Sequence, residues 1–156
     1  MNPERVFLAA QGYSELGMLE DAILELETLP KEMAKRPEIL QFRLNIEMLA
    51  RLWEKGWLTA KTLCEVEPES NFGFIQGAFC LHEQGKTQDA LAFLLDGPVS
   101  LAEDATYHYN IACYHAVLGD FEQTKKSLED CFKIDPSFQP ISKEDPDLKT
   151  FWEKMQ

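Results

Sequence analysis

The sequence predicts an all-α solenoid of four helical hairpins followed by a C-terminal capping helix. The first observation is the stretch 106–136, which consists of two amphipathic segments joined at Leu118-Gly119-Asp120. Apolar residues recur there at steps of three and four, so each helix has one face to bury. The second observation is that this hairpin repeats through the chain without a gap. The third is an apolar stripe near the C-terminus, which is suited to covering the last hairpin.

The repeat becomes visible when the chain is shifted against itself by 34 residues. The turn position then holds Gly17, Arg51, Gly85 and Gly119. The small position of the first helix holds Ala10, Leu44, Ala78 and Ala112. The small position of the second helix holds Ala22, Gly56, Ala90 and Thr124. Two antiparallel helices approach closely where both carry small residues, and the turn between them needs a residue that can adopt positive φ.

This pattern resembles the tetratricopeptide repeat, a family of 34-residue helix-turn-helix units. The family's terminal proline is matched by Pro68 and Pro136, and the resemblance covers about residues 3–136. It implies a right-handed solenoid with repeats at about 3–36, 37–70, 71–104 and 105–138. Repeat two departs from the pattern at Leu44 and Arg51, and Arg43 and Glu47 stand near positions where apolar contacts are expected.

The elements can be assigned in order. Asn2 and Pro3 form a cap and first turn for a helix at about 3–16, and its partner runs from Leu19. Pro30 and Pro98 occupy the same repeat position, so we expect both second helices to end early and a short helical turn to follow at 31–36 and 99–104.

Later elements follow from similar signals. We expect helices over about 38–53 and 57–67, a cap for repeat three near Ser70, and repeat four from Asp104. Asp145 and Pro146 then start a capping helix at about 146–155, whose apolar stripe contains Leu148, Phe151, Trp152 and Met155.

Composition excludes several classes of function. The net charge of −12 argues against nucleic acid, whose phosphates would repel the chain. No run approaches the length of a membrane span, and the N-terminal residues carry no cleavage pattern. The four cysteines (Cys64, Cys80, Cys113 and Cys131) show no CxxC pairing, which favours buried free thiols and a cytoplasmic location.

Catalytic and metal motifs are also absent from the sequence. His82, His108 and His115 stand outside any HExxH pattern, and there is no GxxxxGK, GxGxxG or GxSxG. A thiol–imidazole pair between Cys113 and His82 is the remaining chemical alternative. We therefore expect no enzyme, no cofactor and no metal, with an enzyme or metal-binding protein as a distant third hypothesis.

What remains is recognition of another protein. The resemblance implies that the first helix of each hairpin lines a concave groove. Carried over residue by residue, the expected peptide-binding positions are Phe7, Gln11, Gln41, Asn45, Met48, Phe72, Ile75, Phe79, His82, Tyr109 and Cys113. Exposed apolar and aromatic clusters mark binding surfaces. The alternative is that the superhelix or the C-terminal helix covers part of this stripe.

The leading hypothesis is therefore a non-catalytic scaffold that binds a peptide or helix of a partner protein in its groove. Phe7, Gln11, Phe42 and Phe72 occupy positions where repeats that grip a C-terminal carboxylate carry Lys, Arg or Asn. This favours an apolar or amphipathic ligand, and the acidic charge permits a basic one. Self-association into a homo-oligomer is the second hypothesis.

Overall fold

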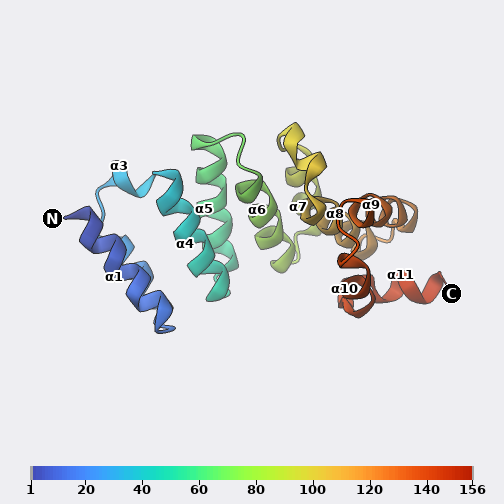
Figure 1. The fold of residues 1–156 in the computed structure, drawn as a ribbon, viewed down its shortest axis with the longest axis horizontal. Helices are drawn as coiled ribbons and strands as arrows, with labels where there is room; N and C mark the ends of the chain where they lie inside the picture. Colours follow the sequence, from blue (N-terminus) through green and yellow to red (C-terminus); the bar gives the residue numbers. More distant parts are fainter. Residues whose placement is uncertain (1, 156) are drawn as a thin grey trace.

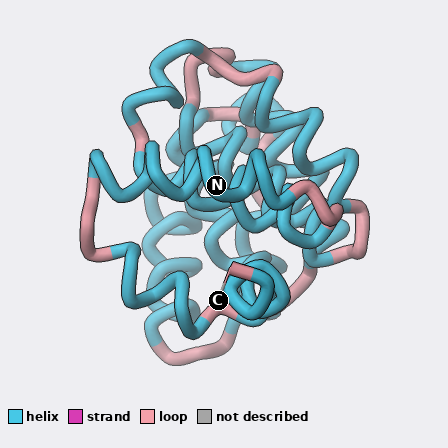
Figure 2. The backbone as a smooth tube through the Cα atoms, turned by 90° about the vertical axis from the view of Figure 1, so that its right-hand side faces the viewer, coloured by secondary structure: helices cyan, strands magenta, loops and turns pink. Residues whose placement is uncertain are grey.

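The computed structural model describes residues 2–155, and its described part is built from helices joined by short loops (Figures 1 and 2). Four hairpins follow one another along the long axis in Figure 1. Their helices are α1 (Pro3–Glu15) with α2 (Leu19–Leu26), α4 (Pro37–Leu49) with α5 (Trp53–Val66), α6 (Asn71–Glu83) with α7 (Thr87–Leu95), and α8 (Ala105–Val117) with α9 (Phe121–Ile134). The predicted all-α solenoid is confirmed.

The small residues of the repeat lie where the helices of each hairpin meet. Ala10, Ala22, Ala78, Ala90, Ala112 and Thr124 are all fully buried, as is Leu44, which replaces the small residue in repeat two. Gly56 faces Leu44 across this hairpin, and a Cβ there would lie 2.8 Å from the Cys80 sulfur. Repeat two thus accommodates a leucine on its first helix, because the facing residue of its second helix is a glycine and has no side chain.

The turns share one backbone conformation. Gly17, Gly85 and Gly119 have φ values of 75°, 78° and 85°. Arg51 occupies the same position in repeat two with φ of 58°, and it is the only residue other than glycine with positive φ in the range 2–155. The geometry of the hairpin therefore overrides the preference of the arginine backbone, at a cost of about 1 kcal/mol.

Two prolines shorten the second helices as expected. α2 ends at Leu26, and Pro30 precedes the four-residue helix α3 (Lys31–Ala34). α7 ends at Leu95, and Pro98 precedes the 3₁₀ helix η1 (Val99–Glu103). Proline cannot donate the backbone bond that would continue either helix, so the chain restarts in a short turn.

Several boundaries differ from expectation. α4 ends at Leu49, because the chain enters its left-handed turn at Arg51, and α5 begins at Trp53, four residues earlier than predicted. Ser70 and Asp104 cap α6 and α8 by accepting bonds from Gly73 N and Thr106 N. The expected capping helix at about 146–155 is divided into η2 (Pro146–Leu148) and α11 (Lys149–Lys154). A further helix that was not predicted, α10 (Phe138–Glu144), precedes them, and the three make up the C-terminal segment.

A buried carboxylate joins the two helices of repeat two, and its arginine partner reaches repeat one. Glu47 is only 1% exposed, accepts a 2.5 Å hydrogen bond from the Thr59 hydroxyl, and lies 3.5 Å from Arg43. The same arginine reaches Glu27 at 3.3 Å. Burial raises the pKa of Glu47, and this effect exceeds the opposing effects of the Thr59 bond and the Arg43 charge.

The backbone strain at Arg51 gives a first prediction. Arg51→Gly should raise the free energy of unfolding by about 1 kcal/mol, because glycine adopts positive φ without a Cβ clash. Gly119→Ala should lower it by about 1 kcal/mol, since no atom lies within 4 Å of an added Cβ and the effect is one of backbone alone. Urea denaturation followed by circular dichroism measures both. Equal stability of Arg51→Gly and Arg51→Ala would contradict the explanation.

The buried carboxylate gives a second prediction. A raised pKa in the folded state means that Glu47 supports folding below its ordinary pKa and loses that contribution as pH rises through the folded value. The free energy of unfolding of Glu47→Gln minus that of the wild type should therefore become more positive from pH 4 to pH 8. A difference that is constant with pH, or that shifts the other way, would show that desolvation does not dominate at this site.

Candidate functional site

The expected groove residues lie on α1, α4, α6 and α8, and the structure divides them into two groups. In repeats one to three, Phe7, Gln11, Gln41, Met48, Phe72 and Phe79 are half-buried and Asn45 is exposed. In repeats three and four, Ile75, Tyr109 and Cys113 are buried, and the side chain of His82 is only 11% exposed. We call the first group the open half of the groove and the second the covered half.

The covered half is in contact with the C-terminal segment of the same chain, which passes in front of α8 (Figure 1). The Tyr109 hydroxyl donates a 2.6 Å hydrogen bond to Asp145, and the Cys113 thiol lies 3.8 Å from the same carboxylate oxygen. His82 Nε2 lies 2.9 Å from Asp147, while its Nδ1 lies 2.9 Å from the Thr87 hydroxyl. Three expected groove residues thus have polar partners within the chain.

Apolar contacts hold the same segment in place. Leu148 and Phe151 are 0% and 2% exposed and belong to the core of repeats three and four. Phe138 packs on Tyr109 at 5.1 Å, and Phe151 packs on Phe121 at 5.9 Å. The segment also closes on itself, since the indole of Trp152 donates to Ser142 O at 3.0 Å and Lys143 lies over the Trp152 ring. It is therefore part of the folded core as well as a cover for the groove.

Burial and hydrogen bonding shift the pKa values of these groups. Burial, followed by the nearby carboxylates of Asp145 and Asp147, raises the pKa of the Cys113 thiol. The hydrogen bond to Asp147 raises the pKa of His82 against the opposing effect of burial. His82 turns its ring nitrogens to Asp147 and Thr87, and so gives Cys113 no base that would make it a nucleophile. The arrangement does not fit a thiol–imidazole pair.

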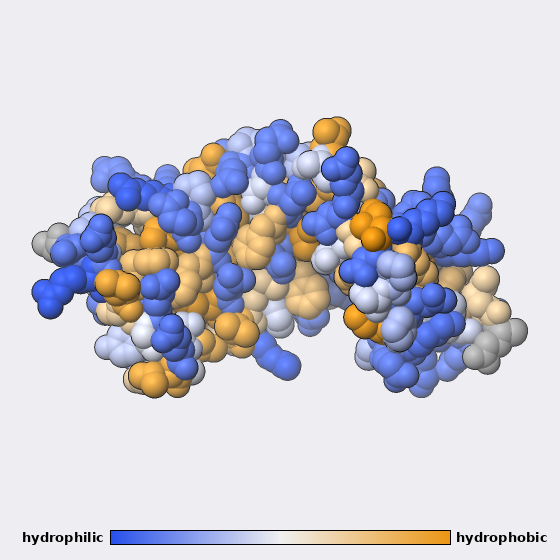
Figure 3. Space-filling model, in the orientation of Figure 1, coloured by the Kyte–Doolittle hydropathy of each residue, from blue (hydrophilic) through white to orange (hydrophobic). Residues whose placement is uncertain are grey.

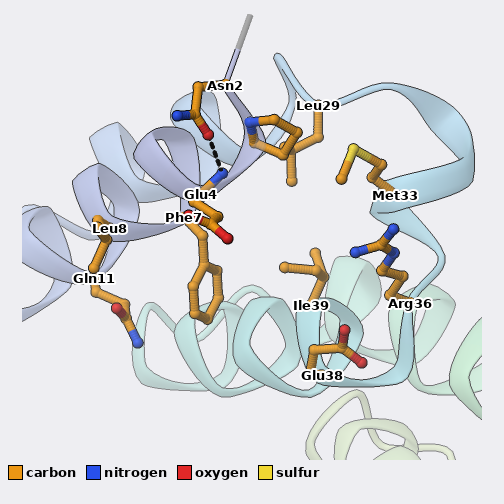
Figure 4. A pocket seen from close by; sticks show the side chains of 11 residues that line it. Asn2, Glu4, Phe7, Leu8, Gln11, Leu29, Met33, Arg36, Glu38 and Ile39 are labelled. Atoms are coloured by element: carbon orange, nitrogen blue, oxygen red, sulfur yellow. Dashed lines mark hydrogen bonds between the residues drawn. The ribbon is translucent and has the colours of Figure 1, made fainter.

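The open half contains a pocket of about 600 Å³ between α1, α3 and the start of α4 (Figure 4). Its apolar lining includes Phe7, Leu8, Leu29, Met33 and Ile39. The short helix α3 supplies Met33, so the pocket exists because Pro30 ends α2 and the chain restarts at an angle. The Phe7 ring meets Phe42 edge-on at 5.1 Å, which fixes the wall between repeats one and two.

An aromatic surface continues along the open half. Phe79 meets Trp53 edge-on at 5.7 Å, and Phe72 packs against the core of repeat two. Figure 3 shows apolar residues gathered over the N-terminal half of the molecule, in the orientation of Figure 1. The apolar and aromatic residues of the open half thus form a strip that continues from α1 to α6.

Charges around this strip are mainly acidic. Glu4 and Glu38 line the N-terminal pocket together with one arginine, Arg36. Further along the first helices, Glu15 and Glu83 are exposed at equivalent repeat positions. None of the expected groove positions carries lysine or arginine.

The arrangement of hairpins defines a tetratricopeptide-repeat fold, as the sequence resemblance predicted. No family model matches the chain, and no curated protein matches it in sequence. Solved structures do match.

A crystal structure of MamA has a TM-score of 0.83 at 14% identity, covering 96% of this chain and 80% of that one. MamA residues 41 to the end from Desulfovibrio magneticus RS-1 gives 0.76 at 16% identity, covering 97% and 90%. YrrB, a TPR protein with an unusual peptide-binding site, gives 0.73 at 11% identity, covering 96% and 76%. At these identities the likeness establishes the fold.

Sequence reasoning missed some residues of the site. Asp145 caps η2, as its place before Pro146 predicts, but it also contacts Tyr109 of α8, and Asp147 contacts His82 of α6. Leu29, Met33 and Ile39 were not expected to form a pocket. The early stop imposed by Pro30 was the available signal, because a restarted chain leaves space beside the preceding helix.

Within residues 2–155, no helix combines the length and the apolar character that crossing a membrane requires.

The packing of the C-terminal segment gives a third prediction. Leu148→Ala should lower the free energy of unfolding by about 2–5 kcal/mol, as expected for a leucine removed from a filled core. Met155→Ala, at a half-exposed methionine of the same segment, should change it by less than about 0.5 kcal/mol. Urea denaturation measures both values. A small effect of Leu148→Ala would mean that the segment is not docked in solution.

Proposed function

We propose that the protein is a non-catalytic interaction scaffold that binds a segment of a partner protein along the open half of the groove. The observation that carries this proposal is the apolar strip from the 600 Å³ pocket to Phe79, which the C-terminal segment leaves uncovered. Apolar concave surfaces with aromatic anchors support recognition of helices and peptides. The resemblance to tetratricopeptide repeats and the matching folds support the same class of function.

The partner segment in this proposal is amphipathic and basic. One bulky apolar side chain enters the pocket between Phe7, Met33 and Ile39, and further apolar side chains rest on the aromatic strip. Basic side chains lie toward the exposed Glu15 and Glu83. The net charge of −12 favours the approach of such a partner, and this attraction weakens as salt rises.

Self-association is the second candidate, favoured by one specific observation. Leu8 and Leu24, on α1 and α2 of the first hairpin, are 65% and 60% exposed. Their exposure fits an end of the solenoid that packs on another copy. Sedimentation velocity over a hundredfold range of concentration distinguishes the two, because only self-association makes the mass depend on concentration.

We also place the protein in the cytoplasm. The four cysteines are all free thiols, and three of them are buried. Burial raises the pKa of Cys64 and of Cys80 to about 12, so both remain protonated at neutral pH and gain no reactivity from their surroundings. Free, unreactive thiols fit a reducing compartment.

A charge-matched pair of variants tests the proposed groove. Gln11→Arg with Asn45→Arg adds two positive charges to the open half, and should weaken capture of a basic partner at least tenfold, or ~1.4 kcal/mol. Gln88→Arg with Gln123→Arg adds the same charge at exposed sites on α7 and α9 and should leave capture unchanged. The measurement is affinity capture from the source lysate with wild type and both variants as baits, followed by titration of the captured protein.

The outcomes separate the candidates. Loss with the groove variant alone supports the proposal, and loss with both variants indicates a non-specific charge effect. Capture that is equal for all three baits would contradict a role for the open half. Circular dichroism must first show the same helical content in the three proteins.

A further inference from the structure

The contact between the C-terminal segment and α8 gathers groups that can bind a metal. One ligand atom each from Cys113, Asp145 and Asp147 lies within 4.8 Å of the other two. A zinc ion bonded to sulfur at about 2.3 Å and to oxygen at about 2.0–2.2 Å holds its ligand atoms roughly 3.5 Å apart. The Cys113 sulfur already lies 3.8 Å from Asp145 Oδ2. The cluster therefore needs only small side-chain movements to reach metal-binding geometry.

Both carboxylates are oriented by a second hydrogen-bonding group. The Tyr109 hydroxyl donates to Asp145 at 2.6 Å, and His82 Nε2 holds Asp147 at 2.9 Å. A carboxylate oxygen can accept such a bond while the group also coordinates a cation, and metal-ligating carboxylates are commonly held in this way. Among the ion pairs of residues 2–155, neither carboxylate has a lysine or arginine partner.

An orphaned hydroxyl provides a second, independent observation. Tyr114 is 1% exposed, and its hydroxyl has no hydrogen-bond partner in the described chain. Its ring lies 4.9 Å from the His82 ring, and His82 in turn holds Asp147 at 2.9 Å. Leaving a buried hydroxyl without a partner is unfavourable, so a polar group beside it is expected. A water on a bound metal is such a group.

We infer that Cys113, Asp145 and Asp147 bind one zinc ion, with a water in the fourth position and Tyr109 and His82 as positioning residues. A thiolate with two carboxylates suits zinc better than magnesium or calcium, which prefer oxygen ligands alone. On binding, a Zn–S bond forms and the Cys113 thiol proton passes to solvent. The Asp147 side chain is 36% exposed and gives the ion a route in.

Such an ion would join the C-terminal segment to repeat four, since Asp145 and Asp147 come from η2 and its cap while Cys113 comes from α8. Its role is structural, and it is independent of the partner proposed for the open half of the groove. Failure of one proposal leaves the other standing.

The test is zinc stoichiometry after equilibrium dialysis of metal-stripped protein against ZnCl₂. The wild type should retain about one zinc per chain, and Asp147→Asn and Cys113→Ser should retain almost none. Asp96→Asn and Cys64→Ser, which make the same chemical changes outside the cluster, should bind as the wild type does. Zinc should also raise the melting temperature of the wild type and of the two control variants. It should leave the melting temperatures of Asp147→Asn and Cys113→Ser unchanged.

Cobalt substitution reports on the sulfur ligand directly. Co²⁺ in the wild type should show a thiolate-to-metal charge-transfer band, and Cys113→Ser should lose it. Asp147→Asn keeps the test valid if Cys113→Ser does not fold, because Asp147 is partly exposed and asparagine retains an acceptor for His82. Absence of stoichiometric zinc in the wild type, or equal zinc in Asp147→Asn, would overturn the inference.

Discussion

The close approach of paired helices at small residues is the constraint on which the rest of the structure depends. Fully buried alanines lie at the crossings of repeats one and three, and in repeat two the small residue is Gly56, which leaves room for Leu44. Because each crossing is tight, the turn that follows must adopt one left-handed conformation, even at Arg51. Regular hairpins then stack so that their first helices share one face. The groove is a consequence of this regularity, and its chemistry is set by whichever residues happen to stand on that face.

That face has two different environments along its length. Over repeats three and four the chain supplies its own cover, and Leu148 and Phe151 fill the core there while Asp145 and Asp147 engage Tyr109 and His82. Over repeats one to three no comparable cover is present in residues 2–155, and Pro30 opens a pocket between α1 and α4. The C-terminal segment thus leaves about half of this face uncovered. It acts as a cap for the last hairpin.

The sequence predicted the hairpins well because their determinants are local. Turn glycines, crossing alanines and the prolines at 30 and 98 each act within one repeat, and the structure places helices and short turns accordingly. The start of α5 was less predictable, since Arg51 gives no glycine-like signal. The sequence allowed a C-terminal segment that covers part of the groove, but it could not single out Tyr109 and Cys113, because their cover depends on contacts with residues 32 or more positions away. Asp145 could be recognised as a cap from its neighbour Pro146, but the direction in which its second oxygen points depends on where the segment docks.

The most direct test of this account is a double-mutant cycle between Tyr109→Phe and Asp145→Asn, measured by urea denaturation in a metal-free buffer. The two residues meet only if the C-terminal segment lies on the groove face, as the 2.6 Å hydrogen bond requires. Because the bond involves a charged acceptor, the account predicts a coupling free energy of about 1–3 kcal/mol. A coupling below about 0.3 kcal/mol would mean that the segment does not lie there in solution, and that the whole face is open to a partner.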